Sequence, residues 1–357
     1  MDSFSESFAE ARGKFLTASA GAGARFKTYP LEAVRGETGE PLATDVACLG
    51  PEVAERVAIV VSGTHGAEGF CGSAIQTRWL SSAHRDLDRT KLVLVHAINP
   101  WAFSHRTRSN ENNVDINRNF IVGNTYHERE KSAYDALAHV LHADPSNAAQ
   151  ALELHLAYKA YLDKHGWELE NEIWQGQWHR PDGFMYGGGA PAWSNITFRR
   201  ILKDHLAGAR IIGFIDWHTG LGKFGEILHL IFDNPSSAEY RAAAGWWGLK
   251  GRDGGAFNAG KRPNYRGLLC QAIHQELPGA RIAGAVIEFG TADDYSVFRG
   301  DILDRWLRFE GRDHPDRPTL RAAYQDILYP RDISWRRLVE KQGPILMEQL
   351  ILGVATW

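Results

Sequence analysis

Five short apolar runs, rich in β-branched residues, predict buried strands along the chain. They occupy residues 56–63, 91–99, 210–218, 227–233 and 281–290. Near-continuous apolar runs of this length are typical of central strands that are covered on both faces. Segments with helical periodicity alternate with the runs and follow them, at 72–84, 128–143, 147–165, 195–206, 237–249, 267–276, 297–309 and 331–351. This alternation predicts an α/β fold, a three-layer sandwich around a central mixed, mostly parallel sheet.

The residues before the first run predict a helix and a hairpin. Apolar side chains recur on roughly one face of an N-terminal amphipathic helix, namely Phe4, Phe8, Ala11 and Phe15. Two further segments, around residues 25–29 and 44–49, are expected to form a hairpin at the edge of the sheet.

The chain shows no internal repeat and no low-complexity linker, so a single domain spanning residues 1–357 is expected. Its most irregular part is residues 174–195, which contain three tryptophans, a run of three glycines and two prolines. A long aromatic loop inside a compact domain is more often functional than idle. This excursion is therefore expected either to line a pocket or to form an ordered surface insertion.

Charge and composition exclude some classes of partner. The chain has 40 Lys and Arg against 43 Asp and Glu, a formal net charge of −3. Nucleic acids and anionic membrane surfaces both attract proteins with a clustered positive excess, and no such cluster is present in the sequence. Neither nucleic acid nor a membrane is therefore expected as the main partner, and the oligomeric state is left open.

The cysteines and the N-terminus predict a cytoplasmic protein. Cys48, Cys71 and Cys270 lie far apart and show no CxxC spacing, which suits a reducing compartment. The first residues lack a basic start followed by an apolar stretch, and no run approaches the roughly 18 apolar residues of a membrane span. Cys71 is interpreted as a small buried residue.

Polar side chains with metal-ligand chemistry gather where the predicted strands end. His65 and Glu68 follow the first run, Asp216 and His218 end the third, and Glu288 lies near the end of the last. Ligands of open α/β sheets collect beyond the carboxyl ends of the strands. Two histidines and one carboxylate match a catalytic zinc site whose fourth position is kept for water. Glu288 would then accept a proton from the water that the metal acidifies.

An HxxE pair by itself is weak evidence for a metal site. With 15 histidines in the chain, such a pair is expected by chance. A second pair, His127 and Glu130, follows no predicted strand and is interpreted as a surface pair. The argument for His65 and Glu68 therefore depends on polar side chains also lying at the ends of the other predicted strands.

Five short motifs occur in a family-like order: GTHGAEG, SHRTRS, VDINRNF, DWHTG and VIEFGT. In that order they resemble the zinc carboxypeptidase (metallocarboxypeptidase) superfamily, including its deacylases of the aspartoacylase and succinylglutamate desuccinylase type. The segments FSESFAEARGKFL and HRPDGFMYGGG resemble more narrowly an uncharacterised bacterial branch of that superfamily. The resemblance covers nearly the whole chain and implies a zinc carboxypeptidase-like fold.

The resemblance implies a metal centre with one Zn²⁺ per chain. Its ligands would be His65, Glu68 and His218. Asp115 would receive the second ring N–H of His65 and so fix the tautomer of that ring. Glu288 would be the general base and later the proton donor to the leaving amine.

The same resemblance implies residues that bind the substrate. Asn117 and Arg118 would hold a terminal carboxylate, which a planar guanidinium matches with two hydrogen bonds. Arg108 would polarise the scissile carbonyl and stabilise the oxyanion, although Arg106 is an alternative for this role. Asn117 could instead shape a turn.

Two features leave the substrate open. Carboxypeptidases of this type supply a mobile tyrosine that no motif places here, so Tyr186 and Tyr265 are both candidates. The short interval from Arg108 to Asn117 and the form of the THGAEG loop are nearer the deacylase pattern. The first hypothesis is carboxypeptidase action on small peptides, and the second is deacylation of an N-acyl amino acid. A non-catalytic metal- or ligand-binding module is a minor third.

Overall fold

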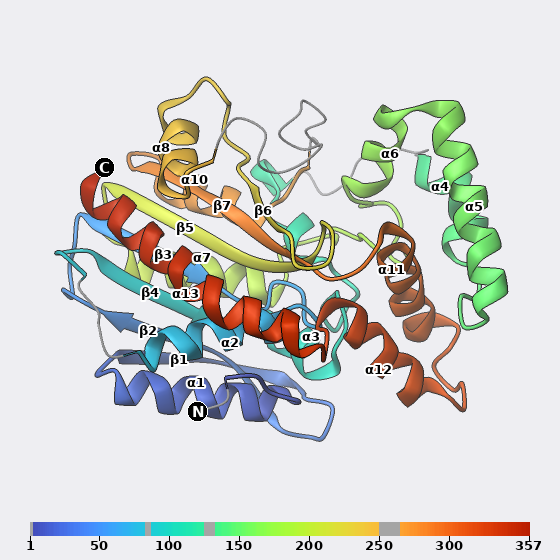
Figure 1. Ribbon diagram of the computed structural model, residues 1–357, viewed down its shortest axis with the longest axis horizontal. Helices are drawn as coiled ribbons and strands as arrows, with labels where there is room; N and C mark the ends of the chain where they lie inside the picture. The colour runs from blue at the N-terminus through green and yellow to red at the C-terminus, as the bar shows by residue number, and fades with distance from the viewer. Residues whose placement is uncertain (1–2, 83–86, 125–132, 250–264) are drawn as a thin grey trace.

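The computed structural model describes residues 3–82, 87–124, 133–249 and 265–357 (Figure 1). His127, Glu130 and the start of the predicted helix 128–143 lie outside these residues. A seven-stranded sheet with the order β1-β2-β4-β3-β5-β7-β6 forms the centre of the fold. Its strands are β1 (Arg25–Arg35), β2 (Pro41–Leu49), β3 (Arg56–Val61), β4 (Lys91–His96), β5 (Ile211–Gly220), β6 (Ile227–Leu230) and β7 (Arg281–Gly290).

The sheet is mixed and mostly parallel, as the sequence predicts. Strands β4, β3, β5 and β7 run parallel to one another in the middle. The edge strands are antiparallel: β1 pairs with β2, β2 with β4, and β6 with β7. The predicted edge hairpin is confirmed as β1 and β2, with longer strands than expected. The central strands are buried along almost their whole length, which explains their continuous apolar runs.

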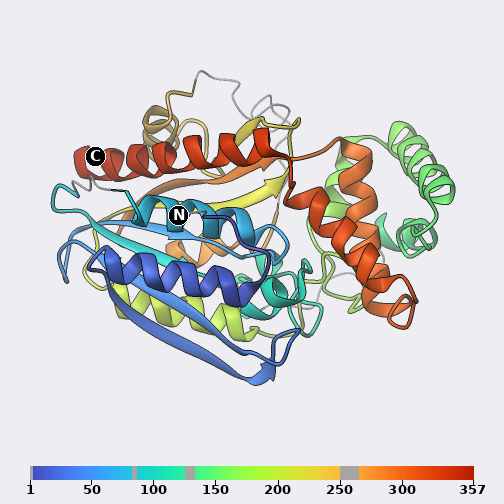
Figure 2. The ribbon, with the colours of Figure 1, turned by 60° about the horizontal axis from the view of Figure 1, so that its bottom comes forward.

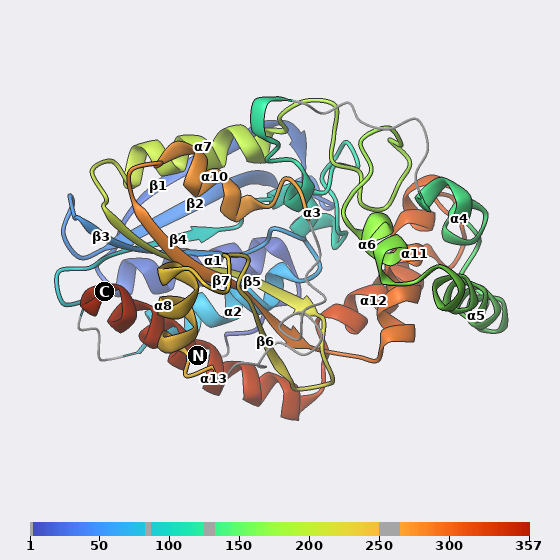
Figure 3. The same cartoon turned by 90° about the horizontal axis from the view of Figure 1, so that it is seen from above.

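Helices cover both faces of the sheet (Figure 3). One face packs against α1 (Phe8–Gly21), α2 (Gly69–Leu80), α8 (Ala238–Trp246) and α13 (Ile333–Thr356). The other packs against α7 (Trp193–His205) and α10 (Leu269–Glu276). The expected three-layer sandwich is thus present, with an apolar core on each side of the sheet.

The N-terminal helix begins later than the sequence predicts. Ser7 caps α1 by accepting a hydrogen bond from the backbone N–H of Glu10, so the helix begins at Phe8. Phe4 precedes the helix but is buried in the same core as Phe8 and Phe15. A capping serine therefore sets the boundary, and the apolar face continues past it.

A further group of helices lies beyond the carboxyl ends of the parallel strands. In Figure 2 the arrowhead of β5 points towards α11 (Asp294–Phe309) and α12 (Arg317–Leu328). Next to them lie α4 (Ala133–Leu141), α5 (Ala148–His165) and α6 (Trp167–Trp174) (Figure 1). The short α3 (Pro100–His105), α6 and α12 are absent from the prediction made from the sequence.

Within the described parts of the chain, no helix is both long and apolar enough to cross a lipid bilayer. Cys48, Cys71 and Cys270 are all buried and none forms a disulfide.

Candidate metal centre

A tight loop between β3 and α2 carries two of the predicted metal ligands. Gly63 has a φ of +73°, a conformation that favours glycine, and it turns the chain away from β3. Gly66 lies so close to α3 that an added Cβ would be 2.0 Å from the carbonyl carbon of Ala102. Glu68 immediately precedes α2, where a carboxylate is stabilised by the positive end of the helix dipole. His65 and Glu68 are thereby held on one rigid turn.

The register between β5 and β7 places the other two predicted site residues, His218 and Glu288, side by side. His218 on β5 is the direct Cα partner of Glu288 on β7 in a parallel ladder. Residues paired in this way lie side by side and project to the same face. Both side chains are buried, and both residues lie near the carboxyl ends of their strands.

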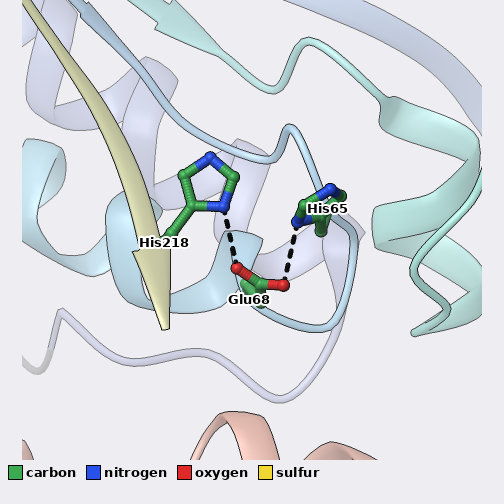
Figure 4. Close-up of side chains that lie close together, drawn as sticks. All are labelled: His65, Glu68 and His218. Atoms are coloured by element: carbon green, nitrogen blue, oxygen red, sulfur yellow. Dashed lines mark hydrogen bonds and ion pairs between the residues drawn. The ribbon is translucent and has the colours of Figure 1, made fainter. Parts of the chain in front are cut away.

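The structure brings His65, Glu68 and His218 together (Figure 4). One candidate ligand atom from each lies within 4.8 Å of the others. The Nδ1 atom of His65 is 2.9 Å from Oε1 of Glu68, and Nδ1 of His218 is 3.0 Å from Oε2. Three donors from two distant parts of the chain thus surround one point.

Each imidazole also contacts a second carboxylate through its other nitrogen. The Nε2 atom of His65 is 3.0 Å from Asp115, and Nε2 of His218 is 3.0 Å from Asp216. Thr64 donates a hydrogen bond to the other oxygen of Asp216. A histidine that donates its second N–H to a carboxylate is the usual arrangement around bound metals.

This pairing is a test of whether the residues fit a metal. When Nε2–H donates to Asp115 or Asp216, the Nδ1 atom of a neutral imidazole directs a lone pair at Glu68. Two acceptors at about 3 Å repel unless a proton or a metal cation lies between them. The donor set therefore requires added positive charge, and two imidazoles with one carboxylate suit Zn²⁺.

The electrostatics of the cluster follow from its burial. Burial acts to raise the pKa of Glu68, but the adjacent His65 and His218 hold that pKa well below its ordinary value. Burial acts to lower the pKa of His218, yet Asp216 and Glu68 raise it well above the usual range. Charges of opposite sign are thus mutually stabilised inside the protein.

Glu288 lies next to this cluster with few partners of its own. Burial raises the pKa of its carboxyl to about 7, the charge of Glu68 adds to that effect, and His218 opposes it. One weak contact, of 3.5 Å, joins its Oε2 to the backbone N–H of Leu221. A carboxyl of this kind is well suited to exchange protons near neutral pH.

Arg108 extends to the cluster of His65, Glu68 and His218, whereas Arg106 pairs with a residue outside it. The Nε atom of Arg108 donates to Asp115 at 3.0 Å, and its Nη1 is 3.7 Å from Oε1 of Glu68. Arg106 has a left-handed backbone at the end of α3 and pairs with the exposed Glu37. The geometry therefore favours Arg108 of the two alternatives left open by the sequence.

Arg118 is buried but contacts only neutral groups and an aromatic ring. Its guanidinium donates to the backbone carbonyls of Asn117 and Trp174, and it lies 4.3 Å from the ring centre of Tyr265. Among the described residues, no carboxylate lies within ion-pair distance of it. Burial lowers the pKa of Arg118 below its ordinary value, although Asp115 opposes the effect.

Asn117 has a structural contact that the sequence did not reveal. Its side-chain carbonyl accepts a hydrogen bond of 2.8 Å from the backbone N–H of Leu269 at the start of α10. Its amide N–H₂ group has no hydrogen-bond acceptor within the described parts of the chain. Asn117 therefore joins two elements and still offers donors next to Arg118.

The tryptophan- and glycine-rich excursion, residues 174–195, contacts the segment that carries Asp115 and Arg118. The backbone carbonyl of Tyr186 accepts from the N–H of Asp115 at 2.7 Å, and the indole of Trp178 donates to the carbonyl of Arg118. The side chain of Tyr186 is half-buried, and burial raises its pKa. The excursion thus fixes the backbone of the VDINRNF segment.

One family matches the sequence over residues 4–342, and it is described as "Protein of unknown function (DUF2817)". The chain belongs to the DUF2817 family. No curated protein matches it.

Solved structures similar to this DUF2817 protein include bovine thrombin-activatable fibrinolysis inhibitor, with 12% identity, coverage of 90% of this chain and 95% of that one, and a TM-score of 0.45. Carboxypeptidase A from Helicoverpa armigera is 12% identical in sequence. The match covers 90% of this chain and 73% of that one, with a TM-score of 0.47. Succinylglutamate desuccinylase from Chromobacterium violaceum is 15% identical in sequence. The match covers 84% of this chain and 74% of that one, with a TM-score of 0.37.

These neighbours include both groups that the sequence motifs resemble, a carboxypeptidase and a desuccinylase. At identities of 12–15% and TM-scores below 0.5, the likenesses carry no argument about the activity of this DUF2817 protein.

Sequence reasoning missed the acidic groups that α11 brings to the site of this DUF2817 protein. Asp304 accepts from the hydroxyl of Thr107 and the backbone N–H of Arg108. Asp301 is buried with Oδ1 4.0 Å from Nη1 of Arg108. Burial raises the pKa of Asp301 to about 7, Arg108 opposes this, and Glu68 adds to it.

Proposed function

We propose that this chain is a zinc-dependent hydrolase that cleaves an amide bond next to a free carboxylate, acting as a carboxypeptidase on small peptides. The observation that carries the proposal is the convergence of His65, Glu68 and His218 beside Glu288, in a geometry that needs a proton or a metal cation between the imidazoles and Glu68. The fit of the donor set to Zn²⁺ is chemical and does not depend on the distant structural neighbours.

Zn²⁺ bound by these three residues would supply Lewis acidity, which makes a water more acidic and a carbonyl more electrophilic. Asp115 and Asp216 would hold the two imidazoles in the tautomer that leaves Nδ1 free for the metal.

Glu288 would remove a proton from the attacking water and return it to the leaving amine. Its buried position beside His218 supports this role, because a carboxyl taken out of water and placed next to the reacting centre can take up and return a proton there. Arg108 would donate hydrogen bonds to the oxyanion that develops on the scissile carbonyl. Its guanidinium is already oriented by Asp115, so little reorganisation is needed during the reaction.

Arg118 would bind the free carboxylate of the substrate. A buried guanidinium without an anionic partner is costly, and an incoming carboxylate supplies the missing charge. Tyr265 covers the guanidinium and limits its contact with water. The amide of Asn117 would add a further donor.

Metal content is the first test of this proposal. The purified wild-type protein and His218→Ala are supplied with zinc, dialysed and analysed for bound metal. About one zinc per chain is expected in the wild type and a loss of most of it in the variant, because one of three protein ligands is removed. A wild-type protein that holds no stoichiometric metal would overturn the proposal.

Activity is then measured with small peptides and with N-acyl amino acids. Turnover of peptides with a free C-terminus supports the carboxypeptidase hypothesis, and turnover restricted to N-acyl amino acids replaces it with deacylation. A zinc-loaded protein that cleaves neither class would point to a non-catalytic module.

A further inference from the structure

Asp301 is a buried carboxylate to which none of the described residues donates a hydrogen bond. It lies on α11 at 7% exposure and makes no hydrogen bond within the described residues. Its one ion pair there is the long contact of 4.0 Å to Nη1 of Arg108. Buried carboxyl groups are normally satisfied by several donors, so an unsatisfied one next to a candidate active site requires an explanation.

Asp304 shows that Asp301 is not simply part of the ionic framework of α11. One turn further along the helix, Asp304 accepts from Thr107, from the backbone N–H of Arg108 and from Arg321. The carboxylate of Asp304 therefore holds in place the segment that carries Arg108. Asp301 faces the same segment without any of these contacts.

The site thus has unsatisfied groups of opposite charge. Among the described residues, Arg118 has no carboxylate within ion-pair distance and donates only to backbone carbonyls, whereas Asp301 accepts no hydrogen bond. Arg108 has contacts on both sides, because it lies 4.0 Å from Asp301 and donates a hydrogen bond to Asp115, three residues before Arg118. One environment lacks an anion and the other lacks a hydrogen-bond donor, which is the pattern that a zwitterion would complete.

We propose that Asp301 binds the free α-ammonium group of the residue on the acyl side of the scissile amide. The preferred substrates are then dipeptides and other very short peptides with an unblocked N-terminus. This inference rests on the proposed function, and it selects zwitterionic peptides over N-acyl amino acids.

The distances favour an α-ammonium group over the amine of a long side chain. Nη1 of Arg108 is 3.7 Å from Oε1 of Glu68, a candidate metal ligand, and 4.0 Å from Oδ1 of Asp301. Asp301 is therefore one guanidinium group away from the reacting centre. An α-ammonium is attached to the carbon next to the scissile carbonyl, so it lies at short range from that centre.

The test compares kcat/KM for a panel of dipeptides and for their N-acetyl counterparts, with zinc-loaded wild type, Asp301→Asn and the control Asp294→Asn. Asp294 lies on the same helix but is exposed. The wild type is expected to prefer the free amine. Asp301→Asn should reduce that preference by roughly 10- to 100-fold, as for loss of a hydrogen bond between charged groups, and Asp294→Asn should leave it unchanged.

Each other outcome is decisive. An equal loss on both substrate forms in Asp301→Asn would show that Asp301 only positions Arg108, which overturns the inference. A wild-type protein that cleaves N-acetyl substrates but not free dipeptides overturns the inference while the proposed function stands. A zinc-loaded wild type that cleaves neither overturns the proposed function, and the inference with it. A preference for the free amine that Asp301→Asn leaves unchanged would overturn the inference as well.

Discussion

Arg108 and Arg118 are both buried arginines, ten residues apart, but their surroundings are opposite. Arg108 lies among the carboxylates of Asp115, Glu68 and Asp301, which together raise its pKa against the effect of burial. Arg118 lies among backbone carbonyls and beneath Tyr265, and burial lowers its pKa. An arginine side chain is thus surrounded by carboxylates in one region and by neutral groups in the other.

The difference indicates what each region is able to bind. A guanidinium already neutralised by the protein does not need a substrate anion, and it remains available to donate hydrogen bonds to a neutral carbonyl. A guanidinium with neutral partners gains most from an anionic group. We therefore expect the Arg108 region to act on the reaction rate and the Arg118 region to act on substrate affinity.

The largest effect should come from Glu288→Gln, which lies beside the Arg108 region. The change keeps the shape of the side chain but removes its ability to accept a proton, so kcat should fall by roughly 10²- to 10⁴-fold. Steady-state kinetics of the zinc-loaded variant measures this, with metal content as the control. Unchanged turnover with normal zinc would remove Glu288 from the mechanism.

Arg108→Lys should lower kcat by roughly 10²- to 10³-fold, the usual cost of losing an oxyanion donor, with a smaller change in KM. Lysine keeps the charge but not the planar fork. The matched control is Arg106→Lys, because Arg106 pairs with the exposed Glu37 outside the site. If both variants behave alike, the distinction between the two arginines is wrong.

The pH dependence of stability tests the burial of Glu288 in the metal-free protein. Its folded pKa of about 7 is above the ordinary value, so the folded protein retains a proton that the unfolded chain loses between pH ~4.5 and ~7. This stabilising contribution is complete below that window and is lost as pH rises through it, by up to about 3 kcal/mol. Urea unfolding should show Glu288→Gln gaining stability relative to wild type at pH 8 but not at pH 4. A pH-independent difference would contradict the assignment.

The smallest effect is expected for Arg118→Met, and it should appear in KM. Loss of a charge-assisted contact should raise KM for substrates with a free carboxylate by roughly 10- to 100-fold, and kcat should change less. Substrates with an amidated C-terminus should be cleaved poorly by wild type and variant alike. Arg200→Met on the surface of α7 is the control. A large fall in kcat with constant KM would reverse the comparison between the two arginines.

Much of the fold follows from the sequence because the central strands must be apolar on both faces. The predicted runs 56–63 and 281–290 coincide closely with β3 and β7. The run 91–99 extends past β4, which ends at His96 because the chain turns there into α3, capped by Asn99. Local capping groups thus decide boundaries that hydrophobicity cannot.

The candidate metal ligands were accessible from the sequence because they lie near or just beyond the carboxyl ends of strands that the sheet holds in place. Asp301 was not accessible for a different reason. Asp301, Asp304, Arg305 and Arg308 recur at the spacing of one helical face, a pattern that normally indicates exposure to solvent. Contacts between α11 and Thr107 and Arg108, nearly 200 positions earlier in the chain, bury this face instead.

The pairing of His218 with Glu288 constrains how this protein could change in evolution. Neighbouring positions along a strand point to opposite faces, so one residue inserted or deleted upstream in β5 or β7 would turn one of the two side chains away from the other. Length changes between α11 and α12 would leave that pairing intact. Diversification of substrate preference is therefore expected to proceed through the helices beyond the sheet, while the lengths of the two strands stay fixed.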